Sequence, residues 1–253
     1  MRLCVLGSGS KGNATYVEQD GQALLIDCGL SSRECMLRLQ RQGIDPFTIK
    51  GIVVTHEHTD HAKGIKLFSQ KLNVPVITSP KTWRKLKISG EFINMRSELE
   101  FSFAGFELRP FNISHDAVDP LALVVEALGV RLGYCTDLGQ VTSMVKENLR
   151  YCTALILESN HEPQLLQQGP YPGWLKMRVA SKRGHLSNQA ALELMEEVNH
   201  PGLKVAIAAH ISQTNNSMEL LTTMWHKRCG MFDNKPGLYF ASQDQELPLI
   251  TIN

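Results

Sequence analysis

Short apolar and β-prone runs, separated by glycine-rich turns, dominate the first part of the chain. Runs of this length and composition are typical of strands in a sheet. We therefore expect strands at 3–6, 15–18, 23–27 and 52–55. Between the last two runs, apolar residues recur with a helical period, which predicts a helix that begins near Ser31 and ends near Gly43.

The rest of the chain first continues as strands and then alternates helices with strands. The strands are expected at 75–78, 99–103, 106–113, 121–126, 130–136, 153–158 and 204–209, and the helices at 140–149, 187–198 and 217–227. The segment 163–173 is rich in proline and glycine, and we expect it to be a surface loop. Since there is no internal repeat or linker-like tract, the pattern predicts a single α/β domain over residues 1–253.

Composition excludes some classes of function. Of the 253 residues, 43% are hydrophobic and 20% are charged, which is ordinary for a globular protein and too apolar for a disordered one. Lys and Arg total 26 against 25 Asp and Glu, so the formal net charge is +1. A protein that coats DNA through a strong overall positive charge is excluded, and any basic patch must be local.

Cysteine usage and hydropathy indicate the compartment. The six cysteines form no Cys-x-x-Cys pair, and most lie in apolar surroundings, which favours a reducing compartment over a disulfide framework. No run approaches the roughly 20 apolar residues of a membrane span, and the apolar run at the N-terminus is too short for a signal peptide. We therefore expect a cytoplasmic protein with no membrane partner.

A glycine-rich loop follows the first expected strand. Residues 7–12 match the dinucleotide-binding pattern Gly-x-Gly-x-x-Gly, and Asp27 stands at the spacing of a ribose-binding carboxylate. That kind of site needs a helix after the third glycine, whereas residues 13–18 have the pattern of a strand. A Walker loop fails as well, because Asn13 stands where lysine is required. We interpret the segment as a connection between strands whose small residues let a substrate approach the backbone.

The most informative segment is 56–61, which reads His-Glu-His-Thr-Asp-His directly after a buried strand. Three imidazoles and a carboxylate so close together cannot all reach one ion, but they can supply ligands to more than one. His56 and His58 are two residues apart, so in extended backbone they point the same way and can share an ion. Asp60 and His61 lie on the next turn and can face a second ion.

Further ligands are expected from distant parts of the chain. His115, Asp137 and His210 each follow an apolar, strand-like run. Strand ends are common positions for site residues, because the scaffold fixes the side chain while the loop leaves it accessible. Any one of them alone would more often be a hydrogen-bonded structural residue. The three together with segment 56–61 favour metal ligands.

With these residues the chain resembles the metallo-β-lactamase-fold hydrolases, whose pattern is His-x-His-x-Asp-His followed by a later His, Asp and His. The segments 7–14, 158–161, 169–172 and 184–188 resemble the YycJ (WalJ) subgroup in particular. The resemblance implies an α/β fold, a four-layer αβ/βα sandwich with the site at one edge between two sheets. It assigns His56, His58 and His115 to one ion, Asp60, His61 and His210 to the other, and Asp137 to both.

Such a site implies hydrolysis by a hydroxide that bridges two divalent metal ions. Two ions about 3.5–4 Å apart generate this nucleophile at neutral pH and stabilise the charge that develops on the substrate. All ligands are nitrogen or oxygen donors, which suits Zn, Mn or Fe and excludes a cysteine-based site. Asp60 is therefore expected to be catalytic as well as a ligand. Asp27, at the end of an expected strand, is either an acceptor for a ligating imidazole or a turn-forming residue.

Several residues of the second half are not needed as ligands. In related RNA-processing members of the superfamily, a histidine in a Gly-His-Ser-like motif helps to protonate the leaving group, and the resemblance gives this catalytic role to His185. Ser187 also occupies the position of a helix N-cap, which is compatible with phosphate binding. The expected substrate contacts are Ser10, Asn13, His161, Ser187 and Asn188.

Two basic runs are candidates for phosphate contacts. The run 176–183 precedes His185 and is the better candidate. The run 81–87 surrounds Trp83 on an expected helix, where a solvated face is the more usual role, although Trp83 is also available for stacking.

Composition and spacing lead only as far as a dinuclear metallo-hydrolase. The YycJ subgroup is associated with 5′→3′ exonuclease action on double-stranded DNA and with mismatch repair, so the resemblance implies DNA as substrate and mismatch-repair proteins as partners. A small-molecule phosphodiesterase, for example for a cyclic phosphate, is the alternative on the same site, and it needs no basic groove. A thioesterase or β-lactamase would give His185 no role and would need an apolar pocket, and β-lactamases often have Cys where Asp137 stands. A metal-binding scaffold without catalysis is the alternative from another class.

Overall fold

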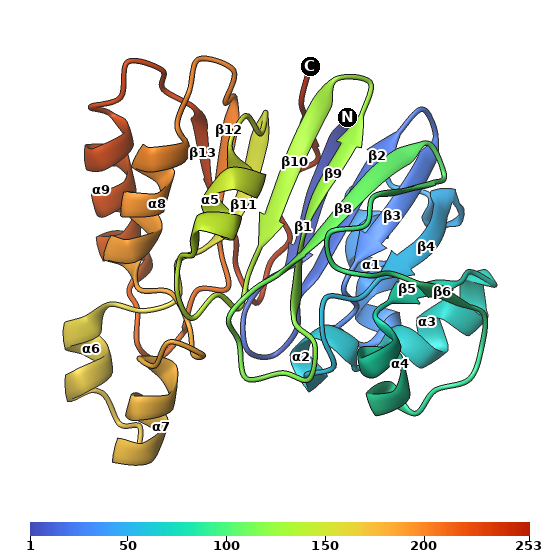
Figure 1. Ribbon diagram of the computed structural model, residues 1–253, viewed down its shortest axis with the longest axis horizontal. Coiled ribbons are helices and arrows are strands. Elements are labelled where there is room, and N and C mark those ends of the chain that lie inside the picture. Colours follow the sequence, from blue (N-terminus) through green and yellow to red (C-terminus); the bar gives the residue numbers. More distant parts are fainter.

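Two seven-stranded sheets form the centre of the structure (Figure 1). The computed structural model describes residues 1–253. In spatial order the first sheet contains β14 (Ile250–Thr251), β1 (Arg2–Gly7), β2 (Ala14–Gln19), β3 (Gln22–Ile26), β4 (Ile49–Val53), β5 (Val76–Thr78) and β6 (Phe92–Asn94). The second contains β13 (Gly237–Phe240), β12 (Val205–Ala209), β11 (Ala154–Glu158), β10 (Val130–Cys135), β9 (Leu121–Ala127), β8 (Phe106–Asn112) and β7 (Phe101–Phe103).

Helices cover the outer faces of both sheets, and short helices lie at one end of the sandwich (Figure 1). On the first sheet these are α1 (Ser32–Arg41), α3 (Ile65–Leu72) and α4 (Pro80–Leu86), and on the second α5 (Ser143–Leu149), α8 (Asn188–Val198) and α9 (Met218–Cys229). The end of the sandwich carries α2 (Thr59–Ala62), α6 (Pro163–Gln168) and α7 (Gly173–Val179). A 3₁₀ turn (Pro46–Thr48) precedes β4.

Three apolar layers hold these elements together. A cluster of 26 buried residues lies between the two sheets and includes Ile26 and Val53 from one sheet and Leu123 and Ile156 from the other. A second cluster, of 24 buried residues, lies between the second sheet and the helices α5, α8 and α9. A third cluster, of 17 buried residues, lies between the first sheet and the helices α1 and α3. Burying both faces of each sheet requires helices outside and a second sheet inside. The expected four-layer αβ/βα sandwich is thereby confirmed.

Each sheet combines an antiparallel half with a parallel half. In the first sheet β3 through β6 run parallel, and in the second β10 through β13 run parallel. The carboxyl ends of parallel strands meet at one edge of a sheet, where α/β proteins usually place their sites. The loops after β3, β4, β10, β11 and β12 consequently gather at the end of the sandwich that carries α2 and α7 (Figure 1).

The expectation for the segment 163–173 was wrong. Instead of an irregular loop, α6 occupies its first six residues and α7 begins at its last one, so that most of the basic run 176–183 is helical or in the turn that follows. Pro163 suits the first helical position, because no hydrogen bond is needed from its missing N–H there. Both helices are too short for an apolar period to show in the sequence.

Other differences concern short elements. The expected strand 52–55 is β4, which begins and ends earlier, and α2, α3, β6, β13 and β14 had not been expected. β14 and β1 are paired although they lie near opposite ends of the sequence, and such a contact cannot be predicted from a local pattern. The expected helix around Trp83 is present as α4. All six cysteines are buried and unpaired, and no helix has the length and apolar character needed to cross a membrane.

Candidate metal centre

Three candidate site residues leave their strands in an unusual backbone conformation. Asp27 follows β3, Asp137 comes two residues after β10, and His210 follows β12, with φ angles of 59°, 59° and 52°. For a residue other than glycine, this left-handed backbone conformation costs on the order of 1–3 kcal/mol. It is retained only where the surrounding structure stabilises it. Here the turn at each strand end aims a polar side chain into the space between the two sheets.

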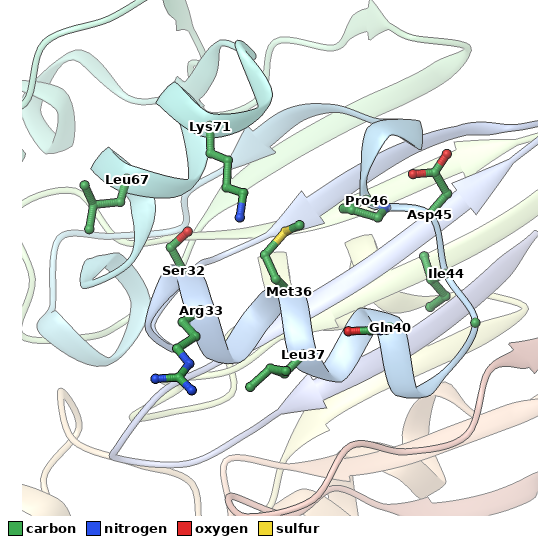
Figure 2. A pocket seen from close by; sticks show the side chains of 11 residues that line it. Ser32, Arg33, Met36, Leu37, Gln40, Ile44, Asp45, Pro46, Leu67 and Lys71 are labelled. Carbon is green, nitrogen blue, oxygen red and sulfur yellow. The ribbon is translucent and has the colours of Figure 1, made fainter.

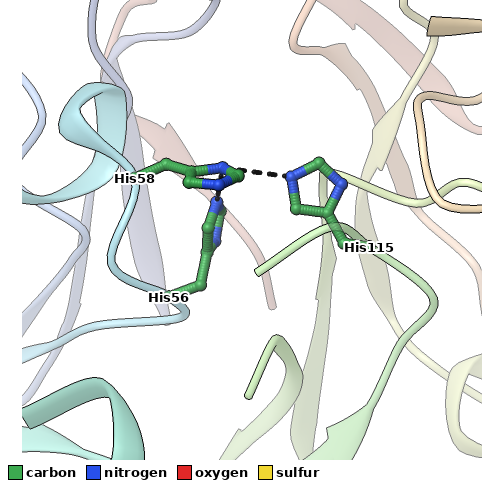
Figure 3. Close-up of side chains that lie close together, drawn as sticks. All are labelled: His56, His58 and His115. Atoms are coloured by element: carbon green, nitrogen blue, oxygen red, sulfur yellow. Dashed lines mark hydrogen bonds between the residues drawn. The ribbon is translucent and has the colours of Figure 1, made fainter. Parts of the chain in front are cut away.

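His56, His58 and His115 form the first cluster, and their ring nitrogens converge on one another (Figure 3). The Nε2 atoms of His56 and His115 each lie 3.2 Å from Nδ1 of His58. Two nitrogens bound to one tetrahedral zinc ion at about 2.0–2.1 Å would lie about 3.3 Å apart. The three rings are therefore spaced as ligands of one ion.

The outer nitrogens of these rings meet hydrogen-bond acceptors. His56 Nδ1 lies 3.0 Å from Oγ1 of Thr55, whose hydroxyl donates to Asp27, and His115 Nδ1 lies 3.1 Å from the carbonyl oxygen of Gly184. A ring that donates outward presents a lone pair inward, as a metal ligand must. Burial lowers the pKa of His56 and of His115, which favours the neutral, ligating form.

The second cluster consists of Asp60, His61, Asp137 and His210. Asp60 Oδ2 lies 3.4 Å from Nε2 of His210 and 3.7 Å from Nε2 of His61. Asp137 faces both clusters, because its Oδ2 lies 3.0 Å from Nε2 of His61 and its Oδ1 lies 3.7 Å from Nε2 of His115. One oxygen toward each group is the arrangement that a bridging carboxylate requires.

Asp137 also provides the test of whether metal ions fit. The residue is 2% exposed, and no hydrogen bond of good geometry reaches its Oδ2, although Nε2 of His61 lies 3.0 Å away. Burial alone would raise its pKa, but the charges of His210 and His61 hold the pKa well below the ordinary value, so the side chain is anionic. A buried anionic oxygen that lacks a donor is costly, and a divalent cation would satisfy it. The seven nitrogen and oxygen ligands fit two such ions.

Asp27 has the first of the two roles that the sequence left open. Its Oδ2 lies 2.7 Å from Nδ1 of His61, and its Oδ1 accepts a 2.9 Å hydrogen bond from the backbone N–H of Thr55. The carboxylate is fully buried. It therefore orients His61 so that Nε2 points into the second cluster.

Glu158, the last residue of β11, is the important site residue that sequence reasoning missed. Its Oε1 lies 2.9 Å from Nδ1 of His185 and 2.8 Å from Nδ1 of His210, while its Oε2 accepts the backbone N–H groups of Leu138 and Leu186 at 2.7 and 2.9 Å. Burial opposes ionisation, but His185 and His210 lower the pKa of Glu158 to about 2. An acidic residue at the end of an otherwise apolar strand was the available signal.

Glu158 could also be counted as a metal ligand, because it forms a third group with Asp137, His185 and His210. Its two oxygens, however, already face four donors, two imidazoles and two backbone N–H groups. The nitrogens of His185 and His210 that face Glu158 therefore carry hydrogens and are not ligating. Glu158 positions two imidazoles rather than holding an ion.

The site opens to solvent through a cleft of about 320 Å³. His58, Asp60 and His185 border it and are partly exposed, whereas the other candidate ligands are buried. Arg178 of α7 lines the same cleft and contacts Asp116 at 2.5 Å. The cleft therefore brings the candidate ligands, the proposed proton donor and one cation together.

The five expected substrate contacts occupy different places. Ser10 lines the cleft, while Asn13 is buried, holds Gly9 by its side chain and has its Nδ2 3.0 Å from Nε2 of His61. His161 and Ser187 border a separate apolar pocket, and Ser187 also caps α8. Asn188 is fully buried and bonds to Ser159 and Asn216.

The two basic runs also differ in their surroundings. In the run 176–183, Arg178 reaches the cleft and Arg183 donates to the carbonyl oxygen of His115. In the run 81–87, Trp83 stacks on Phe92 with ring centroids 4.9 Å apart and packs against the core. The surroundings of Trp83 are those of a packing residue.

A hollow larger than this cleft lies elsewhere, between α1 and α3 (Figure 2). It measures about 910 Å³, and Met36, Leu37, Ile44 and Leu67 give it an apolar character. Asp45 is the only acidic residue that lines it, and it contains no histidine. The smaller cleft, where the titratable side chains converge, is therefore the candidate site.

Gly29 supports the loop that carries Asp60, and replacing it with alanine is expected to damage the site. A Cβ at Gly29 would lie 1.6 Å from the carbonyl oxygen of Asp60, a backbone atom that no rotamer change can move. We expect Gly29→Ala to lower the free energy of unfolding by about 3 kcal/mol or more and to reduce activity. Thermal unfolding would measure this, with Gly173→Ala as the control, because a Cβ there meets open space. Equal unfolding temperatures for the two variants would contradict the expectation.

Comparisons with known proteins agree with this geometry. A family model described as the beta-lactamase superfamily domain matches residues 22–211. The exodeoxyribonuclease YycJ of Bacillus anthracis is 34% identical over 226 residues, which cover 87% of this chain and 86% of that protein. The exodeoxyribonuclease WalJ of Streptococcus pneumoniae is 28% identical over 263 residues, which cover 99% and 98%.

Solved structures show the same fold. Zn²⁺-bound PqqB from Methylobacterium extorquens superposes with a TM-score of 0.76 at 15% identity, covering 98% of this chain and 99% of that one. The metallo-β-lactamase fold protein YhfI from Bacillus subtilis gives 0.74 at 14% identity, covering 97% and 98%. By its sequence, its fold and its clustered histidines and aspartates, the chain belongs to the metallo-β-lactamase superfamily of hydrolases and, within it, to the subgroup of YycJ and WalJ.

Proposed function

We propose that this protein is a metal-dependent exodeoxyribonuclease that digests double-stranded DNA from the 5′ end. The observation that carries the proposal is the placement of His185 and Glu158 beside seven candidate ligands, in a chain that matches relatives named exodeoxyribonucleases over most of their length. A role in mismatch repair belongs to the same proposal on the strength of the resemblance, and a cytoplasmic location belongs to it on the strength of the cysteine usage.

The protein residues have separate tasks in this reaction. When bound, two divalent ions would supply a nucleophilic hydroxide at neutral pH and offset the negative charge that develops on the phosphate. His56, His58 and His115 would hold one ion, Asp60, His61 and His210 the other, and Asp137 both. Ser10 and Arg178 border the space above Asp60, where a phosphate would lie.

His185 is suited to protonate the leaving oxygen. Its Nδ1 is committed to Glu158, so Nε2 is the nitrogen left for the substrate. We expect His185→Ala to reduce phosphodiester cleavage by about 10²–10⁴-fold while metal content stays at two ions per chain. His226→Ala, at an exposed position on α9, is the control. Unchanged cleavage by His185→Ala would leave this residue a packing role only.

The activity itself is tested with a 5′-phosphorylated duplex labelled at one end. We expect stepwise shortening from the 5′ end in Mn²⁺ or Zn²⁺, loss of activity after chelation, and recovery when the metal is restored. Intact DNA together with hydrolysis of a cyclic phosphate would instead identify a small-molecule phosphodiesterase. Shortening from the 3′ end would contradict the proposed polarity.

A further inference from the structure

His185 separates the metal cleft from a second pocket. This pocket, about 550 Å³ in volume, lies among α6, α7 and the beginning of α8. Its apolar wall consists of Pro163, Leu166, Met177, Ala180, Leu186 and Ala190. His185 borders both hollows, and none of the seven candidate ligands borders the second one. A group bound in the second pocket would thus lie across one imidazole from the reacting phosphate.

Polar side chains also line the pocket. His161 borders it and is 4% exposed, and its Nδ1 has no hydrogen-bond partner. Buried polar atoms are nearly always paired, and this unpaired nitrogen belongs to a side chain that borders the pocket. The Gln167 amide and the Ser187 hydroxyl belong to the same lining, and the Lys176 ammonium lies 2.6 Å from the backbone oxygen of Gln167.

Apolar walls with a few convergent polar groups are what a nucleobase requires. The flat faces of a base pack against aliphatic side chains, and its edge presents donors and acceptors to groups such as an imidazole nitrogen or an amide. Lys176 adds a positive charge for a phosphate on the same nucleotide. A metal ion or a free inorganic anion would make no use of the aliphatic side chains.

We propose that this pocket binds the 5′-terminal nucleotide of the DNA strand, the leaving group of the reaction; this inference rests on the proposed function. Hydroxide adds to phosphorus, and the P–O3′ bond breaks with its electron pair remaining on O3′. His185 transfers its proton to that oxygen. The products are a nucleoside 5′-monophosphate with a free 3′-hydroxyl, held in the pocket, and a strand with a new 5′-phosphate.

The first test uses the unmodified protein. Two 5′-phosphorylated duplexes are compared, identical except that one has an abasic 5′-terminal nucleotide, with bis(p-nitrophenyl) phosphate as a reference substrate for the metal centre. We expect kcat/KM for the abasic duplex to be lower by about tenfold or more, because contacts to one base are lost. Equal values for the two duplexes would overturn the inference and leave the proposed function intact. Hydrolysis of the reference substrate without cleavage of either duplex would overturn both.

The second test narrows the pocket. Ala190→Phe places an aromatic ring at the pocket wall, whereas Gln189→Phe adds the same ring at the neighbouring exposed position, which does not border the pocket. Deoxyadenosine monophosphate is expected to inhibit the wild type and Gln189→Phe equally, and Ala190→Phe at least about tenfold more weakly. Thermal unfolding confirms that each variant is folded. Equal inhibition of a folded Ala190→Phe would overturn the inference.

Discussion

Replacing either His58 or Asp60 with alanine is expected to abolish DNA cleavage, with a loss of about 10³-fold or more. Each replacement removes one candidate ligand from a different cluster, and two bound ions would together contribute several kcal/mol to stabilising the transition state. Both side chains are partly exposed at the cleft, so their truncation leaves the apolar core untouched. Cleavage of the labelled duplex, metal content and circular dichroism would be measured together.

Matched controls make this expectation specific. Asp233→Ala and His226→Ala remove the same chemical groups at exposed positions that belong to neither cluster, and both should retain wild-type activity. We expect the His58 and Asp60 variants to bind fewer than two ions while keeping the wild-type circular dichroism spectrum. Full activity in either variant would remove the two-metal assignment.

Replacing Glu158 with glutamine is expected to reduce both activity and stability. Glutamine keeps the volume of the side chain but replaces one oxygen with an NH₂ group. In one orientation of the amide this NH₂ group faces the two imidazole N–H groups, and in the other it faces the two backbone N–H groups. In both cases a donor faces donors. Loss of a partner that orients a metal ligand typically lowers metal affinity or activity 10–100-fold. Because His185 loses its orientation as well, we expect kcat/KM to fall by about 10²-fold or more. An unsatisfied buried donor costs about 1–3 kcal/mol, which urea unfolding would detect.

The stabilisation that Glu158 provides is expected to depend on pH. The pKa of Glu158 falls from 4.5 to about 2 on folding, so its carboxylate stabilises the fold fully above pH 4.5, and this contribution is lost as the pH falls toward 2. The difference in unfolding free energy between wild type and Glu158→Gln should therefore shrink in acid. Glu126→Gln, on β9 of the same sheet at an intermediate exposure, serves as the control. A difference that persists unchanged near pH 2 would show that the carboxylate charge is not responsible.

Most of the predicted helices and strands were confirmed, but length alone did not decide the outcome, because α5 (seven residues) was predicted and α3 (eight residues) was missed. The apolar strands that became β3, β10 and β12 could be located because their side chains fill the core, and the polar residue after each strand stood out against that background. The short helices α2, α6 and α7 gave no period to detect. Their formation depends on packing at the end of the sandwich, which was absent from any local window.

The roles of Asp27 and Glu158 could not be determined from the sequence. Both are acidic residues at strand ends. From the sequence Asp27 was equally compatible with a turn, while Glu158 was noted only as part of the segment 158–161 and was given no role of its own. The role of each depends on a distant imidazole, His61 for Asp27 and His185 and His210 for Glu158. Such partners are set by the order of strands in the two sheets.

The sequence by itself indicated the chemistry: a histidine- and aspartate-rich segment after a buried strand, with further ligand types at other strand ends, favours a metal site. The residue types alone show which side chains can bind a metal ion, so this property can be inferred without the three-dimensional structure. The tertiary structure alone decided which nitrogens face inward, that Asp137 lies between two clusters, and that His185 separates the metal cleft from an apolar pocket. These properties depend on the directions in which strands from two sheets end, and direction in space is fixed only when the whole core is packed.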